Sequence, residues 1–411
     1  MSRPVCLTDA LLQQLAQQYG TPLWVYDAGT IAARVQELRS FDRIRYAQKA
    51  NGNLAVLALL RDMGVDVDAV SAGEVARAMA AGYAPADIVY TADVFDAPAL
   101  ELVGKLPVQV NLGSAFMVEQ LARVRPGATA TVRVNPGFGH GYAKKTNTGG
   151  EASKHGVWHA ELPALIERAH ALGLTLDGLH VHIGSGSDFE HLTRVCAAVS
   201  DLAPLFGSAL RRVSAGGGLP VAYKSHEPAF DAARFCATWL ATKHSIEQRL
   251  GHAIELEVEP GRRLVAECGL LVTRVCGTKR QGTQDYILVD AGFNALARPA
   301  MYGAWHDISI VGAADTAAVA PRLVAGPLCE SGDMYTQGPG GEIEPRLLPD
   351  AREGDLLLVH DAGAYGASMS STYNGHPLAA EVLVHNGVAR LVRRRQTLDE
   401  LLAQERGLTQ P

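Results

Sequence analysis

The sequence has few cysteines, few aromatic residues and no long apolar run. Its six cysteines form no C-x-x-C pair, so neither a zinc finger nor a disulfide framework is predicted. Unpaired cysteines are typical of a reducing compartment, so we expect a cytoplasmic protein. No stretch reaches the ~18–20 apolar residues of a membrane span. The first twenty residues, interrupted by Asp9 and several glutamines, do not have the pattern of a signal peptide.

The charge pattern argues against a nucleic-acid partner. Lys and Arg number 37 and Asp and Glu number 43, which gives a net charge of −6 with both signs interspersed. No basic stripe of the kind that binds nucleic acid is present. The chain has 411 residues, of which 47% are hydrophobic. A chain of this length usually forms more than one domain, and we expect two.

Short β-type runs alternate with helical patterns between about residues 40 and 260, which predicts βαβ units and a parallel sheet. Eight such units are the number in a (β/α)₈ barrel, with a doubly wound open sheet as the alternative. We therefore predict a barrel over residues 28–270 and a mostly antiparallel β domain formed by residues 1–27 with 271–411. The eight β-type runs are Ile44–Lys49, Val65–Ser71, Asp87–Thr91, Val108–Leu112, Thr129–Asn135, Leu176–Ile183, Arg212–Ala215 and Ile254–Glu259.

Chemically useful residues follow several of these runs, where a barrel has its active site. Lys49 ends the first run, and burial there would favour an uncharged, nucleophilic amine, although a lysine whose amine reaches solvent is the simpler interpretation. Gly216, Gly217 and Gly218 follow the seventh run. They are typical of a phosphate-binding turn, or of a plain tight turn. A polar, glycine-rich segment at 143–153 follows the fifth run, and we predict a mobile loop there.

Two histidines and one acid complete this set. His180 and His182 are two residues apart on a strand and face the same side, but no third ligand accompanies them, so no metal site is predicted. His180 is expected to be a core histidine, and His182 can stack on a planar ligand. Glu259 ends the eighth run, where it either pairs with Arg262 or holds a protonated ring nitrogen.

The chain resembles the alanine-racemase-like class of pyridoxal-phosphate enzymes over nearly its whole length, and within that class it is most similar to the diaminopimelate decarboxylases of proteobacteria. The resemblance implies pyridoxal 5′-phosphate as cofactor. The stretches that carry it are YAQKAN (46–51), VRVNPGFGHG (132–141), KTNTGGEASKHG (145–156), HIGSG (182–186), SAGGGL (214–219), EPGR (259–262), DAGFN (290–294), RPAMYGA (298–304), CESGD (329–333) and GAYGASM (363–369).

The resemblance also implies a role for each matched residue. Four match catalytic positions: Lys49, which holds the cofactor covalently, His182, which stacks on its ring, Glu259, which binds the ring nitrogen, and Cys329, the proton donor. The remaining cofactor-binding positions are Asp68, Glu74, Arg133, Ser185, Gly216, Gly217, Gly218, Gly261, Arg262 and Tyr365. The substrate-binding positions are Arg262, Arg298, Tyr302, Glu330 and Tyr365. Cys329 and Glu330 match a pair that the partner subunit of a homodimer supplies.

The implied reaction removes CO₂ from the D-centre of meso-2,6-diaminopimelate and yields L-lysine. Arginines such as Arg298 suit the second carboxylate of this substrate, whereas a decarboxylase of D-lysine, ornithine or arginine needs distal carboxylates. A racemase of this class has an arginine at the position of Glu259. A non-catalytic homologue would have lost Lys49 or the glycine turn. Both alternatives are therefore disfavoured.

Overall fold

A computed structural model describes residues 4–141, 147–186, 188–314 and 316–408. The chain divides into two compact units. One comprises Ala32–Val221 with Ala229–Leu264, and the other comprises Met1–Ile31, Ala222–Pro228 and Val265–Pro411. The domain limits predicted from the sequence, 28–270 and 1–27 with 271–411, stay a prediction. Residues 143–146 of the predicted mobile loop lie outside the described residues, so that prediction also stands untested.

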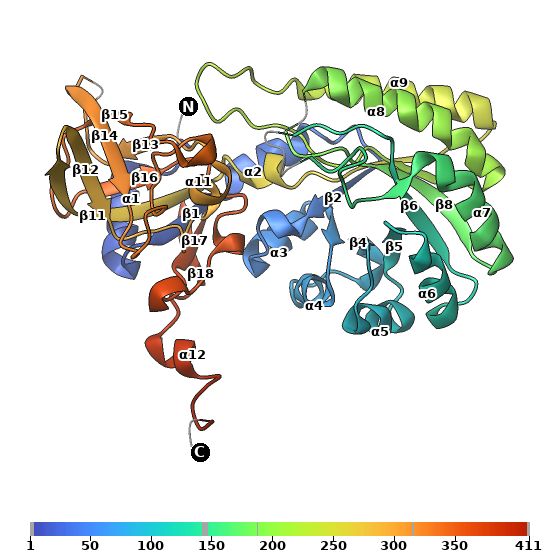
Figure 1. The fold of residues 1–411 in the computed structure, drawn as a ribbon, viewed down its shortest axis with the longest axis horizontal. Helices are drawn as coiled ribbons and strands as arrows, with labels where there is room; N and C mark the ends of the chain where they lie inside the picture. Colours follow the sequence, from blue (N-terminus) through green and yellow to red (C-terminus); the bar gives the residue numbers. More distant parts are fainter. Residues whose placement is uncertain (1–3, 142–146, 187, 315, 409–411) are drawn as a thin grey trace. The chain divides into compact units, whose positions relative to one another are not determined.

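Figure 1 shows the helices and strands in chain order. The helices are α1 (Asp9–Tyr19), α2 (Ala28–Gln36), α3 (Leu54–Asp62), α4 (Ala72–Ala80), α5 (Ala97–Lys105), α6 (Phe116–Val124), α7 (Leu162–Ala171), α8 (Phe189–Leu202), α9 (Ala232–Leu250), α10 (Arg262–Val265), α11 (Arg298–Tyr302) and α12 (Leu398–Leu402). The strands are β1 (Leu23–Asp27), β2 (Arg43–Ala47), β3 (Asp66–Ala69), β4 (Ile88–Ala92), β5 (Gln109–Leu112), β6 (Thr129–Asn135), β7 (Val157–Trp158), β8 (Thr175–Val181), β9 (Arg212–Ser214), β10 (Glu255–Val258), β11 (Gly269–Gln281), β12 (Gln284–Val289), β13 (Ile308–Ile310), β14 (Val319–Ala325), β15 (Arg346–Pro349), β16 (Leu356–Val359), β17 (Ala380–His385) and β18 (Val388–Arg393).

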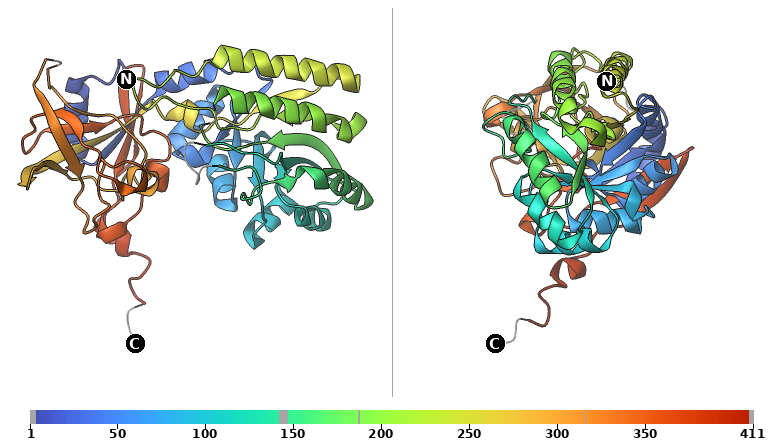
Figure 2. Two further views of the ribbon diagram at one scale, coloured as in Figure 1. Left: turned by 45° about the horizontal axis from the view of Figure 1, so that its top comes forward. Right: turned by 90° about the vertical axis from the view of Figure 1, so that its right-hand side faces the viewer.

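The first unit is a closed parallel barrel, which confirms the predicted fold. Its strands follow the order β5-β4-β3-β2-β10-β9-β8-β6, and pairing of β5 with β6 closes the ring. Every pair in this ring is parallel, and a helix follows each strand. Helices α8 and α9 lie side by side in both views of Figure 2. Because the strands run in one direction, their C-terminal ends meet at one rim, where a barrel has its active site.

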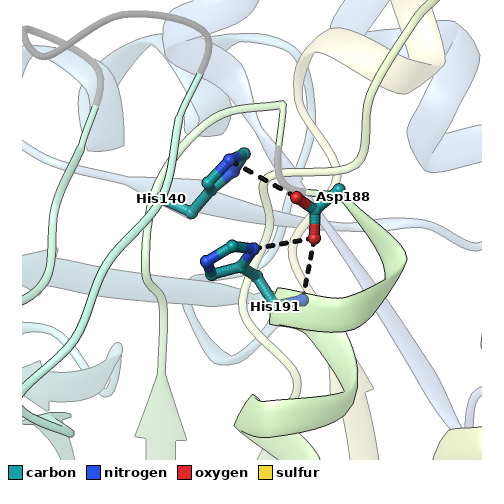
Figure 3. Close-up of side chains that lie close together, drawn as sticks. All are labelled: His140, Asp188 and His191. Atoms are coloured by element: carbon teal, nitrogen blue, oxygen red, sulfur yellow. Dashed lines mark hydrogen bonds and ion pairs between the residues drawn. The ribbon is translucent and has the colours of Figure 1, made fainter.

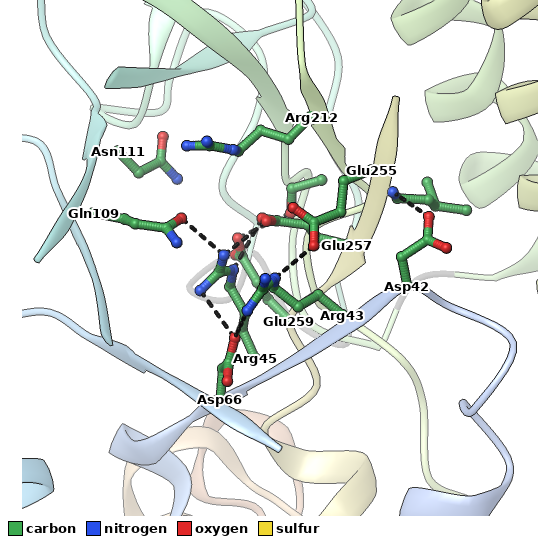
Figure 4. A network of polar contacts seen from close by, with 12 residues as sticks. Asp42, Arg43, Arg45, Asp66, Gln109, Asn111, Arg212, Glu255, Glu257 and Glu259 are labelled. Carbon is green, nitrogen blue, oxygen red and sulfur yellow. Dashed lines mark hydrogen bonds and ion pairs between the residues drawn. The ribbon is translucent and has the colours of Figure 1, made fainter. Parts of the chain in front are cut away.

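Strand β10 shows how the sequence creates a barrel wall with a polar interior. Its residues alternate as Glu-Leu-Glu-Val, with Glu259 directly after the strand. Successive side chains of a strand point to opposite faces, so the three glutamates share one side and the two apolar residues, Leu256 and Val258, share the other. Both apolar side chains are buried. The three glutamates enter the polar network of Figure 4.

A buried ion pair lies in this network below the C-terminal rim. Glu257 accepts hydrogen bonds from Arg45 Nε at 3.0 Å and Arg45 Nη2 at 2.7 Å. The Arg45 side chain is fully buried and that of Glu257 is 5% exposed. Two residues earlier on the same strand, Glu255 pairs with Arg43 at 2.6 Å, and both side chains are about one-third exposed. Two ion pairs of the same chemistry therefore stand at two depths of the barrel.

We expect Glu257→Gln to lower the free energy of unfolding by about 3 kcal/mol, because it removes the closer of two carboxylates beside the buried guanidinium of Arg45 and leaves Asp66, at 3.6 Å. Urea-induced unfolding followed by circular dichroism measures the change. Glu255→Gln is the matched control, and it should cost less than about 1 kcal/mol because water screens the exposed pair. Equal losses in the two variants would contradict the importance of burial.

The second unit contains a mixed sheet that is mostly antiparallel, as predicted. Its order is β15-β14-β12-β11-β1-β17-β18, and β16 joins β11 to β13. Among the described strands of this second sheet, only the pairs β1–β17 and β12–β14 are parallel. Strand β1, from the N-terminal segment that the sequence assigned to the β domain, pairs with β11 and β17 of this sheet. Apolar side chains of α1 and of the central strands form its core: Leu7, Leu12, Leu15, Leu23, Val25, Leu270, Val272, Leu356, Leu358, Val382 and Val384.

Candidate functional site

Polar residues from several strands gather at the C-terminal rim of the barrel. Lys49 lies in a short 3₁₀ turn, Gln48–Ala50, directly after β2. Strand β2 ends at Ala47, two residues earlier than the sequence predicted, and Lys49 is exposed rather than buried. Its charged amine acts electrostatically on Asp68 and Glu74, both of which it favours in the ionised form. Lys49 therefore lies close enough to two acids of the barrel for its charge to favour their ionised forms.

Glu259 is fixed from two neighbouring strands. Ser214 of β9 donates a hydrogen bond of 2.9 Å to Glu259 Oε1, and His180 Nε2 of β8 lies 3.0 Å from Glu259 Oε2. The carboxylate is 8% exposed. Burial alone would raise its pKa, but the neighbouring His180 and the bond from Ser214 lower the pKa of Glu259 to about 2. Glu259 thus presents a negative charge in the barrel at neutral pH.

Asp68, at the C-terminal part of β3, has the opposite behaviour. Burial, followed by the charge of Glu259, raises the pKa of Asp68 to about 7. Its Oδ1 is buried and accepts no hydrogen bond from the described residues. Two carboxyl groups in one site therefore differ in protonation, and Asp68 is the one able to carry a proton at neutral pH.

His182 is oriented by the glycine turn. Its Nδ1 accepts a hydrogen bond of 3.2 Å from the Gly217 N–H, so the proton of the neutral ring is on Nε2. Burial, then the charges of Arg133 and Lys49, lowers the pKa of His182 well below its usual value. Its ring is nearly parallel to that of His180, with an angle of 5° and centroids 6.5 Å apart. A neutral, flat ring held in this way is suited to stacking on a planar ligand.

The glycine turn has room only for glycine. Gly216 and Gly218 have φ angles of +63° and +90°, and a Cβ at either position would lie 2.5 Å or less from a backbone oxygen. A Cβ on Gly217 would lie 2.4 Å from the Glu259 carbonyl oxygen. Two of the three amides are already engaged, because Gly216 N–H donates to Ser214 Oγ and Gly217 N–H to His182. The glycines therefore allow the backbone of the turn to pack closely against its neighbours, whereas at least two of its three N–H groups already have acceptors within the protein.

Three further predicted residues adjoin this turn. Ser185 Oγ accepts hydrogen bonds from Arg262 Nε at 3.3 Å and Nη2 at 3.0 Å, and the arginine is 7% exposed. A hydroxyl and a guanidinium paired in this way form an anion-binding group. The Arg133 Nη2 lies 3.4 Å from the His182 carbonyl oxygen, to which it donates. Gly261 packs against Ala47, where a Cβ would lie 3.2 Å from the Ala47 Cβ.

Glu74 stabilises the start of helix α4, in addition to any contact with a ligand. Its Oε2 accepts a hydrogen bond of 2.8 Å from the Val70 N–H, and its own N–H donates to Ser71 Oγ at 3.1 Å. Ser71 is the N-cap of α4, so these bonds fix the start of that helix. The sequence carries the signal in Ser71-Ala72-Gly73-Glu74, an S-x-x-E capping pattern.

The remaining predicted residues belong to the second unit. Arg298, at the start of α11, is 5% exposed, donates to His306 Nε2 at 2.7 Å and lies over the Tyr223 ring at 4.9 Å. His306 Nδ1 donates to the His360 carbonyl oxygen at 2.7 Å, which fixes its tautomer. Tyr302 is half-buried, and Tyr365 has a φ of +57°. Both members of the predicted interface pair, Cys329 and Glu330, are exposed.

The sequence did not single out Ser214 or Asn111. Asn111 Nδ2 lies 2.7 Å from His180 Nδ1, so His180 is held between Asn111 and Glu259. The expectation that His180 is a satisfied core histidine agrees with this arrangement. Asn111 and His180 are 69 residues apart. Asn111 is on β5 and His180 on β8, the two strands that flank β6, so their contact can be predicted only when the barrel order and register are known.

Comparison with known proteins places the chain among enzymes. A family model described as pyridoxal-dependent decarboxylase, pyridoxal binding domain, matches residues 29–266. Diaminopimelate decarboxylase of Escherichia coli (strain K12) is 51% identical over 407 residues, covering 97% of each chain. A crystal structure of diaminopimelate decarboxylase matches with a TM-score of 0.95 at 50% identity, covering 98% of both chains. The diaminopimelate decarboxylase of Helicobacter pylori complexed with L-lysine matches at 29% identity with a TM-score of 0.86, covering 96% of this chain and 98% of that one.

Proposed function

The chain belongs to the diaminopimelate decarboxylase family of pyridoxal-dependent decarboxylases, and from that premise we propose that it converts meso-2,6-diaminopimelate to L-lysine and CO₂ with pyridoxal 5′-phosphate. The observation that carries the proposal is Glu259, a charged carboxylate fixed by Ser214 and His180 at the rim of the barrel. A carboxylate at this place stabilises a protonated ring nitrogen. The H. pylori relative was crystallised with L-lysine, the product of the proposed reaction.

The residues of the barrel fit this cofactor. Gly216 and Gly218 let the turn pack closely against the backbone of Val181 and Gly184, and the Ser185–Arg262 pair beside it suits a phosphate. His182 presents a neutral ring for stacking, and the buried Asp68 Oδ1 is available to a polar ligand group. When bound, pyridoxal 5′-phosphate supplies a conjugated ring that accepts the electron pair left behind as CO₂ departs.

Each side chain then has one task in the proposed mechanism. The Lys49 amine would hold the cofactor covalently. Glu259 would hold a proton on the ring nitrogen, and His182 would stack against the ring. Arg298 binds a substrate carboxylate through its planar guanidinium, which His306 and Tyr223 orient. Cys329 returns a proton to the α-carbon.

We further propose a homodimer in which Cys329 and Glu330 of one subunit complete the site of the other. The exposure of both residues in the single chain supports this assembly, and the sequence resemblance supplied the idea. We also propose a cytoplasmic location, which the six free cysteines support. Among the described residues, no helix combines the length and the apolar character needed to cross a membrane.

The direct test is to incubate the purified protein with pyridoxal 5′-phosphate and meso-diaminopimelate and to detect lysine by chiral chromatography. L-lysine formation with release of one CO₂ per turnover supports the proposal. Consumption of D-lysine, ornithine or arginine in place of diaminopimelate would move the substrate to that alternative. A change in the configuration of the substrate without CO₂ would indicate a racemase, and cofactor binding with no reaction would indicate a non-catalytic homologue.

Arg298→Ala should raise the KM for meso-diaminopimelate by about 10- to 100-fold, because a bidentate charged hydrogen bond contributes roughly 1.5–3 kcal/mol. Inhibition by 1,5-diaminopentane, which lacks the carboxylate that L-lysine keeps at the L-centre, should change much less. Steady-state kinetics with both ligands measure the difference. Arg298→Lys is the control that keeps the positive charge and loses the planar guanidinium. Its KM for meso-diaminopimelate should lie between those of the parent and of Arg298→Ala. Equal losses for the substrate and for 1,5-diaminopentane would remove Arg298 from its assigned role.

A further inference from the structure

Three potential metal ligands converge outside the set of residues used above. They are His140, Asp188 and His191, here called the His-Asp-His cluster (Figure 3). His140 is in the segment that follows β6, whereas Asp188 is the N-cap of α8 and His191 lies in its first turn. Strands β6 and β8 are parallel neighbours, so the segments that follow them emerge at the same rim. The barrel framework thus brings together residues almost 50 positions apart in the sequence.

The geometry of the cluster is already close to that of a ligand set. His140 Nε2 lies 3.5 Å from Asp188 Oδ2, and His191 Nδ1 lies 2.7 Å from Asp188 Oδ1. The two imidazole rings are stacked, with centroids 4.0 Å apart and an angle of 24°. One ligand atom of each residue lies within 4.8 Å of the others. An ion shared by them would require the side chains to rotate until each ligand atom lies at the ~2.0–2.2 Å bond length of zinc.

We propose that the His-Asp-His cluster binds a divalent first-row transition-metal ion, with Zn²⁺ as the representative. Ions such as Zn²⁺ bind well to a set of two imidazoles and one carboxylate. Mg²⁺ and Ca²⁺ favour an all-oxygen set instead. The side chains of His140, Asp188 and His191 are 32%, 53% and 24% exposed. An ion can therefore enter from solvent, and water can fill the remaining coordination positions.

Helix capping accounts for only part of this arrangement. Asp188 Oδ1 accepts a hydrogen bond of 2.9 Å from the His191 N–H, as an N-cap residue does, and the His191 ring adds a second bond to the same oxygen. A cap requires nothing from the imidazole of His140, which faces the other carboxylate oxygen. His140 is placed there by its own backbone, whose N–H donates to the Ile183 carbonyl oxygen at 3.1 Å. A bound ion would link the segment after β6 to the first turn of α8.

Calorimetric titration of the cofactor-loaded, tag-free and chelator-treated protein with ZnCl₂ tests the proposal. We expect one ion per chain, with affinity reduced by about 100-fold or more in His140→Ala and in Asp188→Asn, because each lacks one ligand. Asp188→Asn is the decisive variant, because asparagine caps a helix as well as aspartate and so leaves α8 intact. His244→Ala, which removes an exposed histidine of α9, is the matched control and should bind as the parent does.

Electron paramagnetic resonance with Cu²⁺ provides an independent count of nitrogen ligands. Coupling to two imidazole nitrogens in the parent and to one in His140→Ala would support the site. Three results would overturn it: absence of stoichiometric zinc binding, binding unchanged in both His140→Ala and Asp188→Asn, or an equal loss in His244→Ala. Thermal unfolding of the metal-free variants separates a lost ligand from a lost fold.

Discussion

Lys49→Ala is expected to lower kcat by about 10⁴-fold or more, the scale on which a covalently acting nucleophile contributes. The physical reason is that the Lys49 amine is the proposed nucleophile and alanine has none. Lys49 follows β2 at the rim, and its charge acts on Asp68, Glu74 and His182. The variant should also lose the visible absorption of a lysine-bound cofactor. Single-turnover kinetics and an absorbance spectrum of the purified protein measure both changes.

Lys49→Arg separates nucleophilic chemistry from simple charge. Arginine keeps a positive charge beside Asp68 and Glu74, but its guanidinium is not a nucleophile at neutral pH. If Lys49 only balances those acids, the arginine variant will retain a tenth or more of the activity. We expect it to be as inactive as the alanine variant. High activity in Lys49→Arg would exclude the assigned role.

Glu259→Gln should lower kcat by about 10²–10³-fold with a smaller change in KM, since it removes a fixed charge that acts on the reacting system. Glutamine has nearly the same shape and can still accept the hydrogen bond from Ser214, so the packing is kept. What it loses is the negative charge that His180 and Ser214 maintain in the parent. The kcat and KM of the two proteins, measured with the cofactor at saturation, give the comparison.

Ser214→Ala is the matched control for the glutamate. It removes one hydrogen bond to Glu259 and leaves the carboxylate, so we expect a loss of only about 5- to 10-fold, equivalent to roughly 1 kcal/mol. If Ser214→Ala were as damaging as Glu259→Gln, orientation rather than charge would be the important property. If Glu259→Gln stayed within tenfold of the parent, the ring nitrogen would need no anionic partner.

The barrel could be predicted from the sequence because its signals are local. The run Thr129–Asn135 coincides with β6, and Val108–Leu112 differs from β5 by one residue. Each is a short β-branched segment followed by a helical pattern, and neither depends on distant contacts. The end of β2 was placed two residues too late, because Gln48–Ala50 continues as a 3₁₀ turn and leaves Lys49 exposed. Strand ends depend on hydrogen bonds to neighbours, which the sequence does not state.

The site was predictable only as a set of residue types. Glu259 and the glycine turn were identified, but the bond from Ser214 to Glu259 joins positions 45 residues apart. Such a bond follows from barrel register and not from spacing in the chain. The hydrogen bonds that the Gly216 and Gly217 N–H groups donate could not be predicted either, because their acceptors are the side chains of Ser214 and His182. Long-range pairing thus decides how the identified residues are used.

Glu255 and Glu257 of β10, with Glu259 directly after it, also have a consequence for how this strand is aligned in the barrel. Glu255 and Glu257 meet arginines of β2, and Glu259 meets Ser214 of β9, so the last strand is held on both sides by its side chains. A slip of one residue in its pairing would turn all three carboxylates toward the apolar layer between strands and helices. That arrangement would bury several unpaired charges, at a cost of several kcal/mol each. The polar interior therefore favours a single register of β10, and this register also brings Glu259 to the rim.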